Sequence, residues 1–401
     1  MRQAEHLDFP LSEYRRRYER LQESMAVDGL DALLLTSRDN VEFVAGYTSP
    51  SWRLSIRCWL IVPAGRDPVL FLHPVHEANA VATSWVDDVR LWGSGARDNL
   101  DLVSDLFRAI GVAAGKIGLE LGPASVLKMT FGEYEGLRQR LAEAAFKDAE
   151  FALGRARWVK SPLEIERLAK ACTITEAGHR AGFSSLAPGK TEREIITTII
   201  GEWNRLGADD PANGTNPGYL SLQSGRVLQM TPSPTDRLIQ AGDLVQVDGG
   251  AVYRGYCADI YRNAYVGDRL PDRLKRYSEA TRQVLAEVVA AIKPGITSAE
   301  MCAAASKAAR DLGVTHLRRK LTSATDAENI YIGHGLGFSM VEHPHINPLD
   351  KTPWVENMCG TLLVSFGDDE TGYVEWEDNF TVTKNGARVL TPSPKEIWVT
   401  G

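Results

Sequence analysis

The chain has 401 residues, of which 44% are hydrophobic, and its 45 Lys and Arg against 52 Asp and Glu give a formal net charge of -7. This size and composition are typical of a globular protein with two domains and exclude a largely disordered chain. Because the charge balance has no basic excess, nucleic acid or an anionic membrane is not expected as the main partner, and small molecules or proteins are expected instead.

The first residues and the cysteines favour a reducing compartment. The N-terminal sequence mixes charged and apolar residues, and no run of about 18 apolar residues occurs in the chain. Its five cysteines lie far apart with no CxxC pair, so neither a disulfide framework nor a structural zinc site is expected. We expect a cytoplasmic protein with reduced cysteines.

Alternating strand and helix patterns over residues 1–155 predict an α/β domain. Ser12 is expected to cap the first helix. The expected strands are the runs DALLLTS, CWLIVP, PVLFLHP, VRLWG and KIGLELG, and further helices are expected near 77–85, 97–111 and 130–145.

A second domain, residues 156–401, is predicted from the sequence RWVKSPLEIERL. Ser161, Pro162 and Glu164 in it fit a capping box with proline at the first helical position. A long helix is therefore expected to begin there.

Two segments of this domain share the pattern P-G-x-T-x-x-E. They are LAPGKTEREI (186–195) and IKPGITSAEM (292–301), with prolines 106 residues apart. Each fits the end of one helix and the capped start of the next. They are either two ordinary helix starts or the mark of an internal duplication around a central sheet.

The run GDLVQVDGGAVYRGYCADIYRNAYVGD predicts a β-hairpin that turns near Arg254 and Gly255. Asp248 and Asp259 would then lie roughly opposite each other. Two buried carboxylates at such a distance need a cation or a shared proton. Alternatively, Asp248 forms a turn and Asp259 pairs with Arg262.

The run GYVEWEDNFTV predicts a strand with acidic residues on both faces. Glu375 and Glu377 share one face, and Asp378 lies on the other. The neighbouring aromatic residues indicate a largely buried strand, in which acidic side chains are unusual.

Taken together, these segments resemble the creatinase, prolidase and methionine aminopeptidase superfamily. VDGGAVYRGYCADIYR fits its two-aspartate hairpin, GHGLG its histidine segment and VEWEDNFTVT its closing glutamate strand. The resemblance implies a creatinase-like N-terminal α/β domain and a C-terminal pita-bread domain with an internal duplication. It places metal ligands at Asp248, Asp259, His334 and Glu377.

Three carboxylates and one imidazole suit manganese, iron, cobalt or zinc, with one ion expected per chain. A site without metal stays open, because creatinase and ectoine hydrolase of this superfamily work without the metal pair. The residues implied in catalysis are His334, Glu342, Glu377 and Asp248.

This chain departs from the superfamily's peptidases at one metal ligand. They carry a further ligand glutamate in strands such as GMVFTIEPG, and the segment GTLLVSFGD puts Phe366 at that position. Asp368, Asp369 or Glu370 could replace the ligand, or they form a solvated acidic turn.

Two histidines that contact and protonate a peptide substrate in those peptidases are also absent. Val341 and Thr231 stand at their positions. Glu342, His343 or His345 could take over the proton transfer, because the leaving nitrogen of an amide must gain a proton.

In dimers of this superfamily a loop of the N-terminal domain reaches the partner's active site, and residues 48–57 are its candidate here. The expected substrate-binding residues are Trp52, Arg53, Thr231, His343 and Phe366. The resemblance therefore implies a homodimer with an active site near the subunit interface.

We predict a hydrolase that cleaves a C–N bond in a small nitrogen compound, such as an amide or a cyclic amidine. The alternatives are an Xaa-Pro dipeptidase or aminopeptidase, an enzyme similar to dimethylsulfoniopropionate lyase, and a binding protein without catalytic activity.

Overall fold

The computed structural model describes residues 2–49, 57–92, 99–123, 125–209, 219–225, 232–314, 331–368, 370–391 and 393–400. Internal contacts divide the chain into two compact units, with the division between Arg157 and Trp158. Each unit is described by itself below.

The first unit is built on a six-stranded sheet with the order β4-β3-β2-β1-β5-β6. Its strands are β1 (Ala32–Leu35), β2 (Cys58–Pro63), β3 (Val69–Leu72), β4 (Asp88–Leu91), β5 (Lys116–Leu119) and β6 (Ala145–Asp148). β2 pairs antiparallel with β1 and β3, and the remaining pairs are parallel. The five predicted strands are confirmed, whereas the edge strand β6 was not predicted.

Helices pack on this sheet and complete the α/β layers. They are α1 (Leu11–Asp28), α2 (Arg38–Ala45), the short 3-10 helix η2 (Pro74–His76), α3 (Glu77–Thr83), α4 (Asn99–Ala109), α5 (Phe131–Arg140) and α6 (Glu150–Trp158). The three helices expected after the first are confirmed as α3, α4 and α5, and α2 and α6 were not predicted. The expected cap of α1 is wrong, because the extended backbone of Pro10 precedes the helix and Ser12 lies in its first turn.

The second unit holds two main antiparallel sheets, with the orders β17-β11-β8-β7 and β13-β12-β14-β15-β16. The strands of the first are β7 (Tyr219–Ser224), β8 (Leu244–Gly250), β11 (Ile260–Val266) and β17 (Trp398–Thr400), of which β17 pairs parallel to β11. Those of the second are β12 (Gly333–Gly335), β13 (Glu342–His345), β14 (Cys359–Asp368), β15 (Gly372–Thr383) and β16 (Gly386–Val389). The hairpin strands β9 (Val252–Tyr253) and β10 (Tyr256–Cys257) form a small ribbon.

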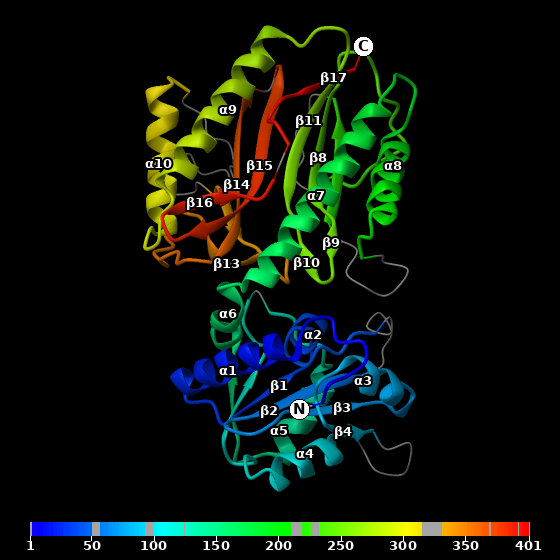
Figure 1. Ribbon diagram of the computed structural model, residues 1–401, viewed down its shortest axis with the longest axis vertical. Coiled ribbons are helices and arrows are strands. Elements are labelled where there is room, and N and C mark those ends of the chain that lie inside the picture. The colour runs from blue at the N-terminus through cyan, green and yellow to red at the C-terminus, as the bar shows by residue number, and fades with distance from the viewer. Residues whose placement is uncertain are drawn as a thin grey trace. The chain divides into compact units, whose positions relative to one another are not determined.

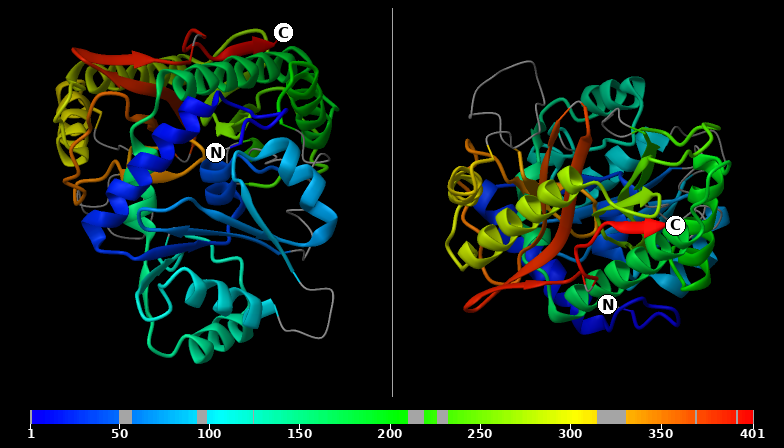
Figure 2. Two further views of the ribbon diagram at one scale, coloured as in Figure 1. Left: turned by 60° about the horizontal axis from the view of Figure 1, so that its bottom comes forward. Right: turned by 90° about the horizontal axis from the view of Figure 1, so that it is seen from above.

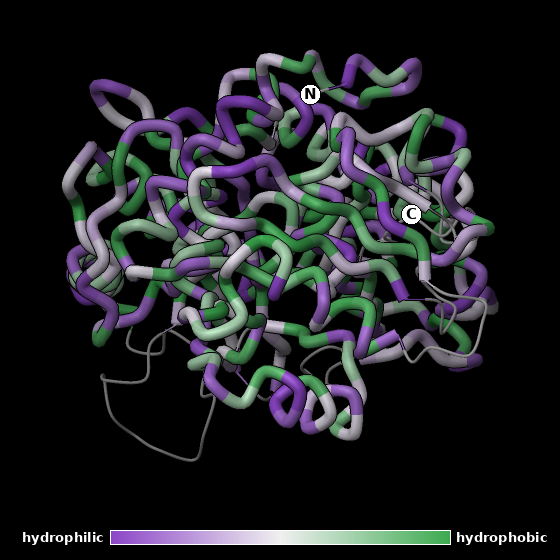
Figure 3. Tube along the Cα trace, turned by 90° about the horizontal axis from the view of Figure 1, so that it is seen from below, coloured by the Kyte–Doolittle hydropathy of each residue, from purple (hydrophilic) through white to green (hydrophobic). Residues whose placement is uncertain are grey.

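Four long helices cover these strands. α7 (Pro162–Ser184) and α9 (Asp272–Ala291) cross in front of them, and α8 (Glu192–Arg205) and α10 (Ser298–Asp311) lie outside them (Figures 1 and 2). One apolar core lies between the first sheet and the α7/α8 pair, and the other lies between the second sheet and the α9/α10 pair. Hydrophobic and hydrophilic stretches are intermixed along the chain (Figure 3).

The duplicated sequence pattern has a structural counterpart in the two halves of this unit. Thr191 and Thr297 each cap a helix through the predicted box. The glycine before each threonine has a left-handed backbone, with φ of 90° at Gly189 and 95° at Gly295. Gly189 donates its N–H to Ile239 O, and Gly295 donates equivalently to the carbonyl of residue 354. The same turn is therefore made twice, which favours duplication over two unrelated helix starts.

The predicted hairpin is confirmed, with a small correction to its register. Arg254 and Gly255 both have positive φ, of 49° and 82°, which is the geometry of a tight hairpin turn. Asp248 lies directly opposite Tyr261, so that Asp259 is its diagonal neighbour on the same face. Among the described residues, no helix is long and apolar enough to cross a bilayer.

The two equivalent glycines offer a test of the duplicated turn. Gly189→Ala and Gly295→Ala would each place a Cβ in open space, so their cost comes from the left-handed backbone alone. We expect each variant to lower the free energy of unfolding by a similar amount, about 1 kcal/mol, in chemical denaturation. The control is Gly201→Ala within α8, which also meets open space and should be neutral or stabilising. Clearly different losses of unfolding free energy in Gly189→Ala and Gly295→Ala would contradict the equivalence of the two turns.

Candidate metal centre

Three buried residues, in or directly before different strands, bring potential metal ligands together. Asp259, His334 and Glu377 each offer one ligand atom, and these atoms all lie within 4.8 Å of one another. Asp259 immediately precedes β11, His334 is in β12 and Glu377 is in β15. All are nearly inaccessible to solvent. Two carboxylates and an imidazole at such distances form a set that can hold a divalent cation.

Hydrogen bonding fixes the orientation of the His334 ring. Its Nδ1 lies 2.9 Å from the carbonyl oxygen of Gly335, and because a carbonyl only accepts, Nδ1 carries the proton. In the neutral ring, Nε2 then has a lone pair, and it lies 3.4 Å from Asp259 Oδ2. A lone pair and a carboxylate oxygen repel each other unless a proton or a metal ion lies between them. The arrangement thus fits a metal ion.

Asp259 and Glu377 fit the same interpretation. Asp259 Oδ1 is buried without a hydrogen-bond partner among the described residues, which costs about 1–3 kcal/mol if nothing binds it. Glu377 Oε1 accepts a hydrogen bond of 2.9 Å from Thr361 Oγ1, which orients the carboxylate. The donor set and the buried oxygen of Asp259 are therefore consistent with the metal that the sequence implies.

Glycines on both sides of His334 are required by close backbone contacts. A Cβ at Gly333 would lie 1.9 Å from Thr361 O, and one at Gly335 would lie 2.6 Å from His343 O. Gly333 also has a φ of 144°, in the region that favours glycine. The flanking glycines therefore let β12 run close to its neighbours and carry His334 into the cluster.

The strand register corrects the position of the missing ligand. Leu363 lies directly opposite Glu377, whereas Phe366 lies opposite Val374. Since side chains alternate between faces, Leu363 shares the face of Glu377 and Phe366 points into the core under α9. Phe366 was expected to contact substrate, and the structure places it away from the cluster instead.

A shift of three residues brings sequence and structure into agreement. The motif GMVFTIEPG then aligns with NMCGTLLVS, residues 357–365, so that methionine and threonine match at Met358 and Thr361. Asn357 takes the place of the motif's glycine and has a positive φ of 69°, as a glycine position allows. The glutamate of the motif falls on Leu363, which is buried.

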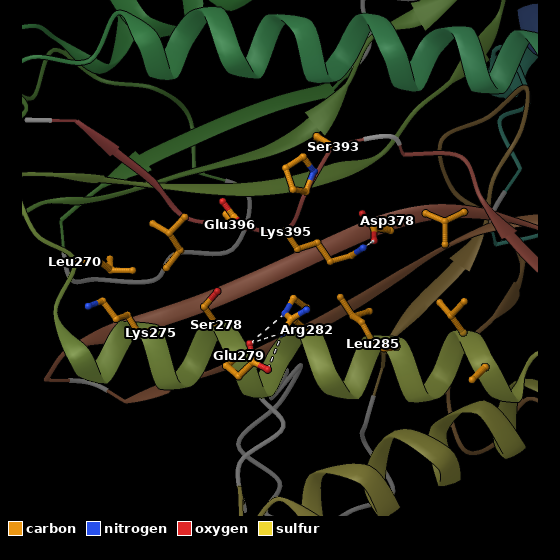
Figure 4. A pocket seen from close by; sticks show the side chains of 16 residues that line it. Leu270, Lys275, Ser278, Glu279, Arg282, Leu285, Asp378, Ser393, Lys395 and Glu396 are labelled. Atoms are coloured by element: carbon orange, nitrogen blue, oxygen red, sulfur yellow. Dashed lines mark hydrogen bonds and ion pairs between the residues drawn. The ribbon is translucent and has the colours of Figure 1, made fainter.

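Asp378 lies on the opposite face of β15, where its carboxylate forms ion pairs with two basic side chains. Its carboxylate lies 2.9 Å from Arg262 Nη2. It also lies 2.6 Å from Lys395 Nζ, on the side of the strand that Figure 4 shows. It borders a cavity of about 820 Å³ on the α9 side of the strand. Arg262 also binds Glu176 at 2.9 Å. The alternative in which Arg262 pairs with Asp259 is therefore wrong.

Side chains, rather than a backbone ladder, join the two sheets at the cluster. We call this contact between β11 and β15 the seam, and no ladder crosses it in the part of the chain that the structure describes. Arg262 Nη1 donates to Glu377 O at 2.7 Å, and Asn263 Nδ2 donates to Glu375 O at 2.6 Å. Asn379 bonds through its side chain to the backbone of Asp259. None of these roles was predicted from the sequence.

Asp248, the fourth predicted ligand, lies outside the group of three. It is partly exposed in β8, on the same face as Asp259 but diagonal to it. Its role as ligand or catalytic group stays a prediction.

Glu342 was predicted to be catalytic and is part of a buried ion pair. Its Oε2 lies 2.9 Å from Lys160 Nζ, with both side chains nearly inaccessible to solvent. It also accepts a hydrogen bond from the backbone of Ser339. This pairing joins the segment just before α7 to the histidine segment, which favours a structural function, and the catalytic role of Glu342 stays a prediction.

The other two histidines of this segment, His343 and His345, do not join the ligand group. His343 contacts Thr352 through Nε2 and Asp350 through Nδ1. His345 lies opposite His334 in the strand pair, with Nδ1 3.4 Å from the hydroxyl of Tyr331. Val341 is half exposed.

Other predicted site residues are placed elsewhere or not described. Trp52, Arg53, Thr231 and Asp369 lie outside the described residues. Asp368 and Glu370 each form an ion pair with Arg273, at 3.0 and 2.9 Å, and do not reach the cluster. The alternative in which Asp368 or Glu370 replaces the missing ligand is therefore wrong.

Comparison with known proteins places this geometry in a family. The model of metallopeptidase family M24 matches residues 166–384, more than half of the chain. The chain belongs to metallopeptidase family M24. The model of the creatinase/prolidase N-terminal domain matches residues 17–159.

Relatives cover nearly the whole chain. The uncharacterized peptidase YqhT of Bacillus subtilis is 28% identical over 385 residues, 95% of this chain and 99% of that protein. The Xaa-Pro dipeptidase of Pyrococcus horikoshii is 26% identical over 384 residues, 95% of this chain and 98% of that protein. The solved Xaa-Pro dipeptidase from Bacillus anthracis aligns with a TM-score of 0.80 at 22% identity, over 96% of this chain and 100% of the other.

Family membership confirms the predicted superfamily and the α/β fold class, with a creatinase-like N-terminal domain and a pita-bread domain. It also confirms that the chain is a hydrolase acting on C–N bonds. Divalent metals are the cofactors typical of this family of metallopeptidases, which agrees with the buried cluster.

The buried ion pair of the histidine segment gives a stability prediction. Lys160→Met leaves the Glu342 carboxylate buried without this counter-ion, and should lower the free energy of unfolding by about 3–5 kcal/mol in chemical denaturation. The double variant Lys160→Met/Glu342→Met should recover much of the loss, because no charge remains buried. Full stability of Glu342→Gln together with lost turnover would contradict the structural function and support the catalytic one.

Proposed function

We propose that this chain is a metal-dependent hydrolase that binds one divalent ion at Asp259, His334 and Glu377 and cleaves a C–N bond in a small molecule. The observation that carries the proposal is the buried group of three ligand atoms within 4.8 Å of one another. Manganese, iron, cobalt or zinc suits this mixture of carboxylate and imidazole ligands. An ion bound there would supply Lewis acidity to a water molecule and to the carbonyl of the substrate.

The protein residues contribute ligand orientation and a low-dielectric environment. His334 presents Nε2 because Nδ1 is bound to Gly335 O. Thr361 holds Oε1 of Glu377, and burial of the cluster excludes bulk water. Three protein ligands leave positions open for water and substrate, which is typical of catalytic rather than structural metal sites.

Leu363 supports a centre with a single ion. Its apolar side chain lies opposite Glu377, at the position where the aligned family motif has a ligand glutamate. The pair of ions expected from the family motif would therefore lack one of its carboxylate ligands, the one implied for the site that uses His334.

Metal analysis tests this proposal. Protein purified without chelator should contain about one divalent ion per chain, as expected for a site with three protein ligands. Asp259→Ala and His334→Ala should abolish both metal content and turnover. Lys395→Met, which removes a partner of Asp378 on the far face of β15, should retain metal. Absence of metal in the natural chain under every metal supplement would contradict the proposal and favour a mechanism like that of creatinase.

Leu363→Glu tests the proposed number of ions. A carboxylate opposite Glu377 should increase the metal content per chain, measured by elemental analysis, because it restores a ligand of the family motif. Leu363→Gln is the control, since it has a similar shape without the charge. Equal metal content in the natural chain and a correctly folded Leu363→Glu would contradict the assignment of Leu363.

An Xaa-Pro dipeptide is the second candidate substrate. It is favoured by the relatives named Xaa-Pro dipeptidase, which match almost the entire chain. Assays of the metal-loaded protein should compare Xaa-Pro dipeptides with small amides and cyclic amidines. Rapid turnover of the dipeptides would replace our first choice of substrate and leave the metal centre as proposed.

A further inference from the structure

Asp259 lies just outside the regular pairing of its hairpin. β11 begins at Ile260, whose partner in β8 is Gly249, and Asp259 precedes this register. On its other side, Ala258 N donates to Ala251 O, so the N–H and C=O of Asp259 lie between two paired positions, point away from β8 and need other partners. These partners come from the second sheet, across the seam.

The side-chain amide of Asn379 takes the place of a backbone partner. Its Oδ1 accepts a hydrogen bond from Asp259 N at 3.1 Å, and its Nδ2 donates to Asp259 O at 2.5 Å. Both polar groups of one residue are thus bound by one side chain, as in a paired strand. Asn379 is fully buried, and Cys172 Sγ also contacts its Oδ1, at 3.2 Å.

Asn379 also belongs to the strand that carries another ligand. It lies two residues after Glu377 in β15 and on the same face. Thr361, opposite Asn379, binds the Glu377 carboxylate at 2.9 Å and reaches Asp259 O at 3.4 Å. The ligands Asp259 and Glu377 are therefore connected by one short stretch of β15 and its neighbour.

We propose that Asn379 is a positioning residue that holds Asp259 in register with Glu377 and His334 for metal binding. The proposal rests on the metal-dependent function proposed above. Replacing a residue that orients a metal ligand typically lowers metal affinity about 10–100-fold, because the ligand must then be ordered when the metal binds.

The seam provides a matched control for this role. Asn263 is also a buried asparagine, and its Nδ2 donates to Glu375 O at 2.6 Å, between the same two strands. It contacts none of the three ligands through this bond. Asn263→Leu and Asn379→Leu each remove a buried amide that crosses the seam, but only the second releases Asp259.

The experiment measures the metal dissociation constant of each folded variant by competition with a chelator, and the absorption spectrum of the cobalt-substituted protein. Asn379→Leu should weaken metal binding about 10–100-fold and alter the cobalt spectrum. Asn263→Leu should stay within about threefold of the natural chain, since it leaves the ligands in place. Asn379→Ser, whose hydroxyl can replace one of the two bonds, should recover part of the loss and serves if Asn379→Leu does not fold.

The outcomes separate this inference from the proposed function. If the natural chain binds no metal, the proposed function fails. If the natural chain binds metal and the Asn379 variants bind it equally well, the positioning role is overturned while the metal centre stands. Equal losses in the Asn263 and Asn379 variants would also overturn it, because the effect would then belong to the seam in general.

Discussion

The constraint on which this site depends is the burial of two carboxylates and an imidazole within 4.8 Å of one another, from strands of two different sheets. Such a group is costly unless a cation balances its charge, and its geometry is unstable unless the two sheets are held in register. Here the register is set by buried side chains that donate to backbone carbonyls, above all Arg262 and Asn379. Both side chains are buried because the carbonyls that they bind lie between the two sheets.

The internal duplication explains how one chain builds such an arrangement. Each half supplies a helix pair, an apolar core and an antiparallel sheet, and the same glycine turn precedes the second helix of each pair. One acid, Asp259, directly precedes an inner strand of the first half and the other, Glu377, lies in an inner strand of the second half, which also supplies the histidine. The site therefore belongs to neither half, and its chemistry needs both.

Much of the fold could be predicted because its signals are local. The capping boxes at Ser161, Thr191 and Thr297 and the turn at Arg254 are each set by a few adjacent residues. Phe366 was misplaced because a motif aligned on the wrong glycine puts its residues on the other face of an alternating strand. The partner of Glu342, Lys160, could not be predicted, since 182 residues separate the two in the sequence.

The seam has one more consequence, which concerns the backbone amide of Asp259. Ladder amides are protected by neighbours on both sides, but this N–H depends on a single side-chain oxygen. Local opening of a structure requires less free energy where fewer backbone bonds must break. The rate of hydrogen exchange at this amide should therefore report how often the contact between the two sheets opens. An ion bound to ligands from both sheets would lower that rate.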